Sequence, residues 1–151
     1  MIFLYKMMST FFFIGTIKYA PGTFGSIAAI IIWYIFTVYE LGSYFILFFI
    51  FFLITGFISV YFYLLTSNNK DPKEVVIDEV AGQSIPLIAI QSTSDVLIVV
   101  IAFIFFRFFD ILKIYPINKI ENLPGTFGVM LDDVAAGIYT LIIVIIYMNI
   151  F

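Results

Sequence analysis

Residues 41–66 read LGSYFILFFIFFLITGFISVYFYLLT, and this stretch contains no charged side chain. A helix rises about 1.5 Å per residue, so the stretch is longer than the roughly 30 Å hydrocarbon core of a bilayer. A small soluble domain cannot bury such a helix and still present a polar surface. The segment therefore predicts a membrane-spanning helix and decides the class of fold.

The composition of the whole chain agrees with a membrane protein. Of its 151 residues, 64% are hydrophobic and 11% are charged, whereas soluble domains carry about 25% charged residues. The length predicts one domain, residues 1–151. A net charge of −3 with seven lysines and arginines argues against nucleic-acid binding, which needs a basic face.

The chain contains neither histidine nor cysteine. This excludes disulfides, thiolate nucleophiles, phosphohistidine intermediates and the zinc sites built from these side chains. An enzyme with this composition would rely on carboxylates, lysine, arginine, hydroxyl groups or a metal ion that prefers oxygen ligands.

Four shorter apolar stretches accompany Leu41–Thr66, and each becomes long enough to cross a membrane when its polar flank is included. Together they predict an all-α polytopic membrane protein, a helical bundle of about four to five membrane segments. The N-terminal residues Met1–Ile14 are interrupted by polar side chains and predict an interfacial or re-entrant helix. The four stretches are Ile27–Tyr39, Val75–Ile90, Val96–Lys113 and Val129–Met148.

Alternating directions for these segments place the lysines on one side of the membrane. Only Glu40 and Asp95 fall in the short turns on the other side. Lysine and arginine are enriched in cytoplasmic loops, so the lysine side is predicted to face the cytoplasm. The lysines on that side are Lys6, Lys18, Lys70, Lys73, Lys113 and Lys119.

Five acidic residues fall inside these segments at one depth. Counting from the outer ends of the segments places Asp78, Asp110 and Asp133 about 20–24 Å along their helices. Carboxylates at one level repel one another unless a cation joins them, and their oxygens suit Mg²⁺, Mn²⁺ or Ca²⁺. The alternative is that they pair with Arg107 and the lysines. The five acids are Asp78, Glu79, Asp110, Asp132 and Asp133.

Basic and hydroxyl side chains near these acids are candidates for binding a phosphate. Arg107, Asp110 and Lys113 are spaced three residues apart and share a helix face, so they form either a phosphate site or a local ion ladder. The sequence PGTFG occurs at 21–25 and again at 124–128, each time before a predicted helix. Glycine and a free helix N-terminus favour anion binding there.

Three hydroxyl or basic side chains around the first PGTFG copy, Lys18, Thr23 and Ser26, complete the candidate phosphate-binding set. Gly82 and Gly137 each lie four residues after an acid, Asp78 and Asp133. Glycine allows helices to approach closely in membranes, so these two positions are predicted to be helix-packing points.

Four motifs in order make the chain resemble the phosphatidylglycerophosphatase A family. The resemblance implies a phosphatase at the bacterial inner membrane, multi-pass, with its active site facing the cytoplasm. It further implies Mg²⁺-dependent hydrolysis of the phospholipid phosphatidylglycerophosphate to phosphatidylglycerol. The motifs are APGTFGS (20–26), DEVAGQ (78–83), FRFFDILK (106–113) and GVMLDDVAAG (128–137).

This resemblance assigns roles to the candidate residues. The Mg²⁺ ligands would be Asp78, Glu79, Asp132 and Asp133. Asp110 would be a further ligand or an orienting group, and Arg107 and Lys113 would neutralise phosphate charge. Either water or a carboxylate could attack the phosphorus.

The sequence departs from the family pattern at two places. The family usually has Lys-Pro-x-Pro after its Phe-Asp motif, whereas Ile114 follows Lys113 here. The family often has Gly-Gly before its last motif, where this chain has the second PGTFG copy. These differences concern the stiffness of a loop and the role of the second turn.

The alternative hypothesis is a small cation- or proton-coupled transporter, because intramembrane carboxylates are typical of transporters as well. A transporter predicts carboxylates near the midplane that are reachable from both faces. The predicted cluster lies toward one face, which favours the enzyme.

Overall fold

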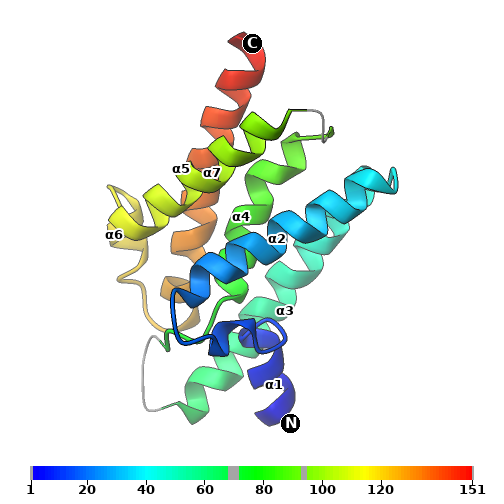
Figure 1. Ribbon diagram of the computed structural model, residues 1–151. Helices are drawn as coiled ribbons and strands as arrows, with labels where there is room; N and C mark the ends of the chain where they lie inside the picture. Colours follow the sequence, from blue (N-terminus) through cyan, green and yellow to red (C-terminus); the bar gives the residue numbers. More distant parts are fainter. Residues whose placement is uncertain (1, 68–71, 93–94, 151) are drawn as a thin grey trace.

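The computed structural model describes residues 2–67, 72–92 and 95–150, and these residues form helices and connections with no strand (Figure 1). The all-α prediction is therefore confirmed. The elements in chain order are α1 (Ile2–Ser9), η1 (Ile14–Thr16), α2 (Pro21–Val38), η2 (Gly42–Tyr44), α3 (Phe45–Thr66), α4 (Ile77–Ala89), α5 (Val96–Leu112), α6 (Ile117–Ile120) and α7 (Thr126–Ile150).

Three stretches in the described part of the chain are long and apolar enough to cross a membrane: α2, η2 with α3, and α7. The predicted segments at 75–90 and 96–113 are also helical, but α4 has 13 residues and α5 has 17. The predicted segment at 75–90 was too long at its start, because the backbone of Val76 is not helical (φ −140°, ψ 4°) and α4 begins at Ile77. The Val76 amide donates instead to the Ser9 carbonyl at 3.0 Å.

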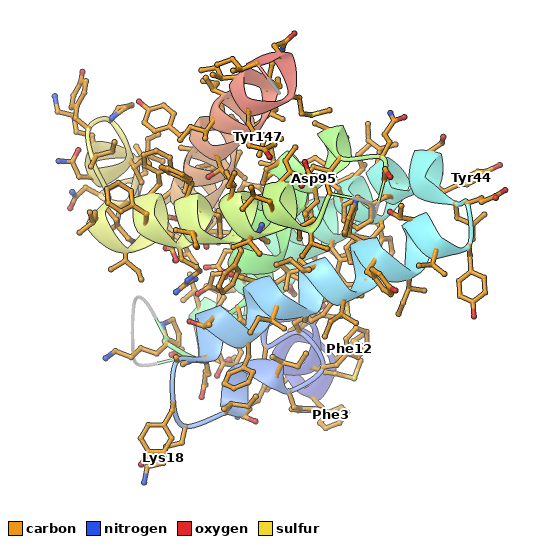
Figure 2. All side chains as sticks on the ribbon, turned by 45° about the horizontal axis from the view of Figure 1, so that its top comes forward. Phe3, Phe12, Lys18, Tyr44, Asp95 and Tyr147 are labelled. Atoms are coloured by element: carbon orange, nitrogen blue, oxygen red, sulfur yellow. The ribbon has the colours of Figure 1, made fainter. Side chains whose placement is uncertain are left out.

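Apolar side chains cover the outside of the bundle, and polar ones lie within it. Ile31, Phe51 and Ile104 are each more than half exposed, whereas Gln83 and Thr140 are fully buried. Figure 2 shows side chains such as Phe3, Phe12 and Tyr44 projecting outward from the ribbon. The interior contains apolar side chains as well, but an exterior this apolar is typical of a protein whose surroundings are lipid.

Helix α4 lies at the centre of the bundle and packs against α2, α3, α5 and α7 (Figure 1). Ten of its 13 residues are buried. The backbones of α4 and α7 meet where Gly82 and Gly137 face each other. A Cβ atom on Gly82 would lie 2.6 Å from the Asp133 carbonyl oxygen, and one on Gly137 would overlap the Gly82 carbonyl. The predicted packing role of both glycines is confirmed.

The N-terminal segment folds back onto the bundle. Helix α1 packs against α3, and the Tyr5 and Phe62 rings stack with centroids 4.6 Å apart. The chain then reverses through Phe11–Phe13, whose φ angles are positive. With eight residues, α1 rises about 12 Å, which is too short to span a bilayer.

The two PGTFG copies start their helices differently. In the first copy, Pro21 is the first residue of α2, so the copy forms the first helical turn and not a turn before the helix as predicted. Proline suits this position because the first amides of a helix have no intrahelical acceptor. In the second copy, Gly125 has φ +63°, and α7 begins at Thr126.

Replacing Trp33 tests how α2 is fixed to α4. The buried Trp33 Nε1 donates to the Ile90 carbonyl at 2.8 Å. We expect Trp33→Phe to lower the free energy of unfolding by about 1–3 kcal/mol, because the Ile90 carbonyl loses its partner. Thermal unfolding in detergent measures this. Tyr34→Phe, at an exposed neighbour, is the control, and equal effects of the two changes would contradict the expectation.

Candidate active site

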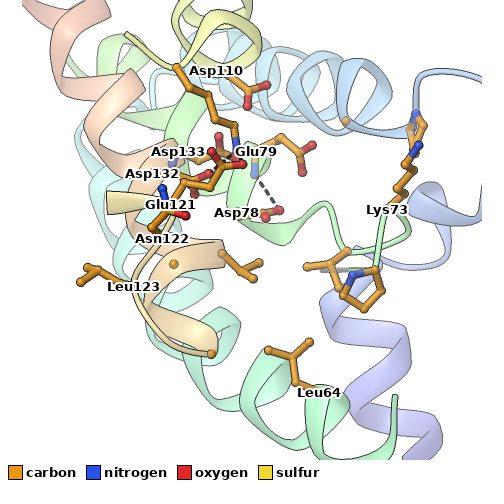
Figure 3. Close-up of a pocket in the computed structure, with 18 of the residues that line it drawn as sticks. Leu64, Lys73, Asp78, Glu79, Asp110, Glu121, Asn122, Leu123, Asp132 and Asp133 are labelled. Carbon is orange, nitrogen blue, oxygen red and sulfur yellow. Dashed lines mark hydrogen bonds and ion pairs between the residues drawn. The ribbon is translucent and has the colours of Figure 1, made fainter. Parts of the chain in front are cut away.

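A cavity of about 1080 Å³ opens between the first turns of α2, α4 and α7 and the end of α5. We call it the main cavity (Figure 3). Among the described residues, six carboxylates and three cationic side chains line it, so negative charge is in excess in this part of the lining. The acids are Asp78, Glu79, Asp110, Glu121, Asp132 and Asp133, and the cations are Lys73, Arg107 and Lys113.

Three of the acids converge on one point. Asp78 and Glu79 lie in the first turn of α4, and Asp133 lies in the second turn of α7. One carboxylate oxygen from each lies within 4.8 Å of the others. The contact between Gly82 and Gly137 makes this possible, because it brings the two helix backbones together one turn further along. The predicted approach of the α4 and α7 carboxylates is confirmed.

This set of three oxygens is chemically suited to a divalent cation. Asp78 and Asp133 are 8% and 3% exposed, and Glu79 Oε2 is buried with no hydrogen-bond partner among the described residues. A buried, unpartnered carboxylate oxygen is costly, since it has lost its hydration. Carboxylate oxygens are the ligands that Mg²⁺ and Ca²⁺ prefer, so the residues present fit such an ion.

Gly22 holds α2 against this acidic group. A Cβ atom at Gly22 would overlap Glu79 Oε1 and would lie 3.2 Å from Arg107 Nη1. The first PGTFG copy therefore contributes Gly22, which has no side chain and so lets the backbone of α2 approach the Glu79 carboxylate.

Two of the three cationic side chains predicted to bind phosphate, Arg107 and Lys113, line the main cavity and already contact carboxylates. Arg107 Nη1 lies 2.6 Å from Asp110 Oδ2. Lys113 Nζ lies 2.7 Å from both Glu121 Oε1 and Asp132 Oδ2. The alternative of local ion pairing is thus partly confirmed, although Lys113 pairs with Asp132 and Glu121 and not with Asp110 as the ladder predicted.

Lys113 lies just beyond the end of α5. Burial alone lowers the pKa of its ammonium group, but the hydrogen bonds to Asp132 and Glu121 outweigh burial and raise that pKa above its usual value. Lys113 therefore stays charged at neutral pH.

Asp132 and Asp133 are neighbours in sequence but serve different groups. Successive side chains on a helix point about 100° apart, so Asp132 turns to Lys113 while Asp133 joins the acids of α4. The structure therefore brings together three of the four predicted metal ligands, and Asp132 is not among them. Asp110 lies close enough to Glu79 and Asp133 to interact electrostatically with both.

The other predicted phosphate-binding residues lie away from the main cavity. Ser26 is buried, with its hydroxyl donating to the Gly22 carbonyl at 3.0 Å and lying 3.5 Å from Arg107 Nη1. Thr23 lines neither this cavity nor the smaller one beside it, and Lys18 lines only the smaller one.

Two further residues, Glu121 and Lys73, line the main cavity although the sequence motifs did not predict them as site residues. Glu121 follows α6 and reaches back to Lys113, eight positions earlier in the sequence, and no periodicity predicts such a contact. Lys73 is one of the lysines predicted to face the cytoplasm, but it lies in none of the four motifs, so nothing in the sequence connected it to the acids. Lys70, another of those lysines, lies outside the described residues.

Comparisons with known proteins agree with these motifs. A model of the family described as phosphatidylglycerophosphatase A matches residues 7–148. Two relatives carry that name. One, from Haemophilus influenzae, is 41% identical over 86% of this chain and 80% of its own length. The other, from Escherichia coli, is 34% identical over 82% of this chain and 72% of its own length.

A third relative, from Bacteroides thetaiotaomicron, is named "Putative phosphatidylinositol-3-phosphatase" and is 37% identical over 94% of this chain and 92% of its own length. No solved structure matches the chain at a comparable level of significance. The transporter hypothesis is not favoured. The matches cover the four motifs that surround the main cavity, and the chain therefore belongs to the phosphatidylglycerophosphatase A family and is a phosphatase.

Proposed function

We propose that the protein removes the terminal phosphate of phosphatidylglycerophosphate, giving phosphatidylglycerol and inorganic phosphate, with the help of Mg²⁺. The convergence of Asp78, Glu79 and Asp133 in the main cavity carries this proposal. The names of two relatives support the lipid. The name of the Bacteroides relative refers to another lipid with the same chemistry, a phosphate monoester beyond a phosphodiester.

Asp78, Glu79 and Asp133 would hold the Mg²⁺. When bound, the ion would polarise the phosphate and help to activate a nucleophile. The unpartnered Glu79 Oε2 supports this assignment, because a metal ion would satisfy it.

Arg107 would bind the reacting phosphate from the side of α5. Its Nη1 is paired with Asp110, while its buried Nε has no hydrogen-bond partner among the described residues. A guanidinium held at one end by a carboxylate is oriented to donate from the other end to a phosphate oxygen. Asp110 would orient this group, and Lys113 would add positive charge while Asp132 and Glu121 hold it in place.

The main cavity would face the cytoplasm of a bacterium, with the protein in the inner membrane. The described lysines lie in α1, before α2, between α3 and α4, and around α6. No lysine or arginine occurs in the two connections at the opposite end of the bundle, which join α2 to α3 (residues 39–44) and α4 to α5 (residues 90–95). Positive charge is enriched on the cytoplasmic side, which supports this orientation.

Cysteine labelling tests the orientation, since the chain has no native cysteine. Ser92 and Lys119 are exposed at opposite ends of the bundle. We expect Ser92→Cys to react with a membrane-impermeant thiol reagent in spheroplasts. We expect Lys119→Cys to react only in inside-out vesicles, and the reverse pattern would reject the orientation.

Phosphate release from the purified protein tests the function itself. The protein in detergent would receive phosphatidylglycerophosphate or phosphatidylinositol 3-phosphate, with Mg²⁺ or with a chelator. We expect release from phosphatidylglycerophosphate that stops on chelation and returns when Mg²⁺ is added. Equal release in the presence of chelator would contradict the metal assignment, and faster release from phosphatidylinositol 3-phosphate would contradict the substrate.

A further inference from the structure

A second cavity of about 490 Å³ adjoins the main cavity. The two have four lining residues in common: Pro21, Ser67, Pro72 and Lys73. The second cavity is otherwise formed by the connection from η1 to α2 and by Glu74, and Lys18 lies in that connection. Space for a ligand therefore continues from the acidic group toward two lysines.

The cationic side chains differ between the two cavities. In the main cavity, Arg107 and Lys113 are each paired with carboxylates at 2.6–2.7 Å. Lys18 and Lys73 form no ion pair with any described residue. The lysines that remain for a second anionic group therefore both line the second cavity, Lys73 where that cavity joins the main cavity and Lys18 on the second cavity alone.

The positions of the two lysines are also distinct. Figure 3 shows Lys73 across the main cavity from Asp132 and Glu121. Figure 2 shows Lys18 projecting outward from the chain, and its ammonium lies 5.8 Å from the centroid of its neighbour's ring, Tyr19. Lys73 thus stands at the junction of the cavities, and Lys18 at the outer rim.

Among the residues that the structure describes, Glu74 is the one acid in the lining of the second cavity, and it already has a partner. Its Oε1 accepts a hydrogen bond from the Tyr63 hydroxyl. Two lysines against one engaged carboxylate leave the described lining of this cavity with net positive charge.

We propose that the second cavity binds the phosphodiester of the lipid substrate, with Lys73 and then Lys18 as the groups that recognise its charge. This inference rests on the proposed function. In phosphatidylglycerophosphate, a single glycerol joins the monoester to the diester, so the diester must lie close to the reacting phosphate. An adjoining cavity with two ammonium groups that form no ion pair within the described residues provides that place.

Recognition of the diester by Lys73 and Lys18 differs from the general attraction of any exposed lysine to an anionic membrane. A lysine near an anionic bilayer surface contributes about 1 kcal/mol of binding whatever the substrate. Lys119 provides the comparison, because it is exposed on the same side of the bundle, lies over the Tyr115 ring and lines neither cavity.

A cycle that combines a change in the enzyme with a change in the substrate tests the proposal. The substrates are phosphatidylglycerophosphate and a synthetic analogue whose diester is methylated to a neutral triester, with the monoester intact. The full-length enzyme and its Lys73→Gln, Lys18→Gln and Lys119→Gln variants are assayed in mixed micelles with Mg²⁺. The measured quantity is the ratio of kcat/KM for the two substrates.

We expect the unmodified enzyme to prefer the charged diester by about fivefold or more. Lys73→Gln should reduce this ratio toward one, mainly through KM, Lys18→Gln should reduce it less, and Lys119→Gln should leave it unchanged. Thermal unfolding of each variant checks that its fold is retained.

An unchanged ratio in Lys73→Gln would overturn the proposal, as would an unmodified enzyme without a preference. An equal reduction in Lys119→Gln would show general attraction and would also overturn it. If the unmodified enzyme released no phosphate from either lipid, the proposed function itself would fail, which is a separate result.

Discussion

Asp133→Asn is expected to lower phosphatase activity by more than about 100-fold and to raise the Mg²⁺ concentration that the enzyme needs. Asp133 supplies one of the three converging carboxylates, and asparagine keeps its size but removes its charge. Asp133 forms no ion pair with a described cation. Removing it should relieve repulsion, so the metal-free protein should be as stable or slightly more stable.

Asp132→Asn is the matched control, because it makes the same change at the next residue. Asp132 is buried and pairs with Lys113. Its loss leaves Lys113 with Glu121 alone, so we expect the free energy of unfolding to fall by about 1–3 kcal/mol. Activity assays and thermal unfolding in chelator would measure both variants. Full activity in a well-folded Asp133→Asn protein would defeat the assignment of Asp133 to the metal.

Gly137→Val is expected to be the most destabilising of the changes considered, by about 3 kcal/mol or more. The added Cβ would overlap the Gly82 carbonyl oxygen. The obstacle is backbone, so no side chain can move aside, and α7 must separate from α4. Since Asp133 lies one turn away on α7, activity should fall as well.

Gly42→Val is the control for this change, because no atom lies within 4 Å of a Cβ built on Gly42. We expect its effect to stay within about 0.5 kcal/mol. Thermal unfolding in detergent compares the two variants. Similar melting temperatures would show that α4 and α7 are not held together at these glycines.

The long uncharged helix α3 and the approach of Asp78 and Asp133 could be predicted, because both follow from counting residues along the sequence. The uncharged run that became α3 is long enough by itself to indicate a span. The depths of Asp78 and Asp133 follow from counting residues along a helix, and the structure places their carboxylates together.

The remaining features depend on three-dimensional contacts that no residue count contains. The divergence of Asp132 from Asp133 is set by how α7 is rotated against α4 and Lys113. The place of Glu121 depends on the path of the connection through α6. The hydrogen bond from Val76, the residue before α4, joins the start of this helix to Ser9, which is far away in sequence.

The shortness of α4 has a consequence for how a lipid is handled. Its 13 residues rise about 20 Å, roughly two thirds of the hydrocarbon thickness of a bilayer. Four helices surround it, so this hydrophobic mismatch exposes none of its backbone to acyl chains. The main cavity opens at the acidic end of α4. On the proposed function, a headgroup would enter this polar recess while its acyl chains stay in the leaflet, so the lipid would not have to be lifted out of the bilayer.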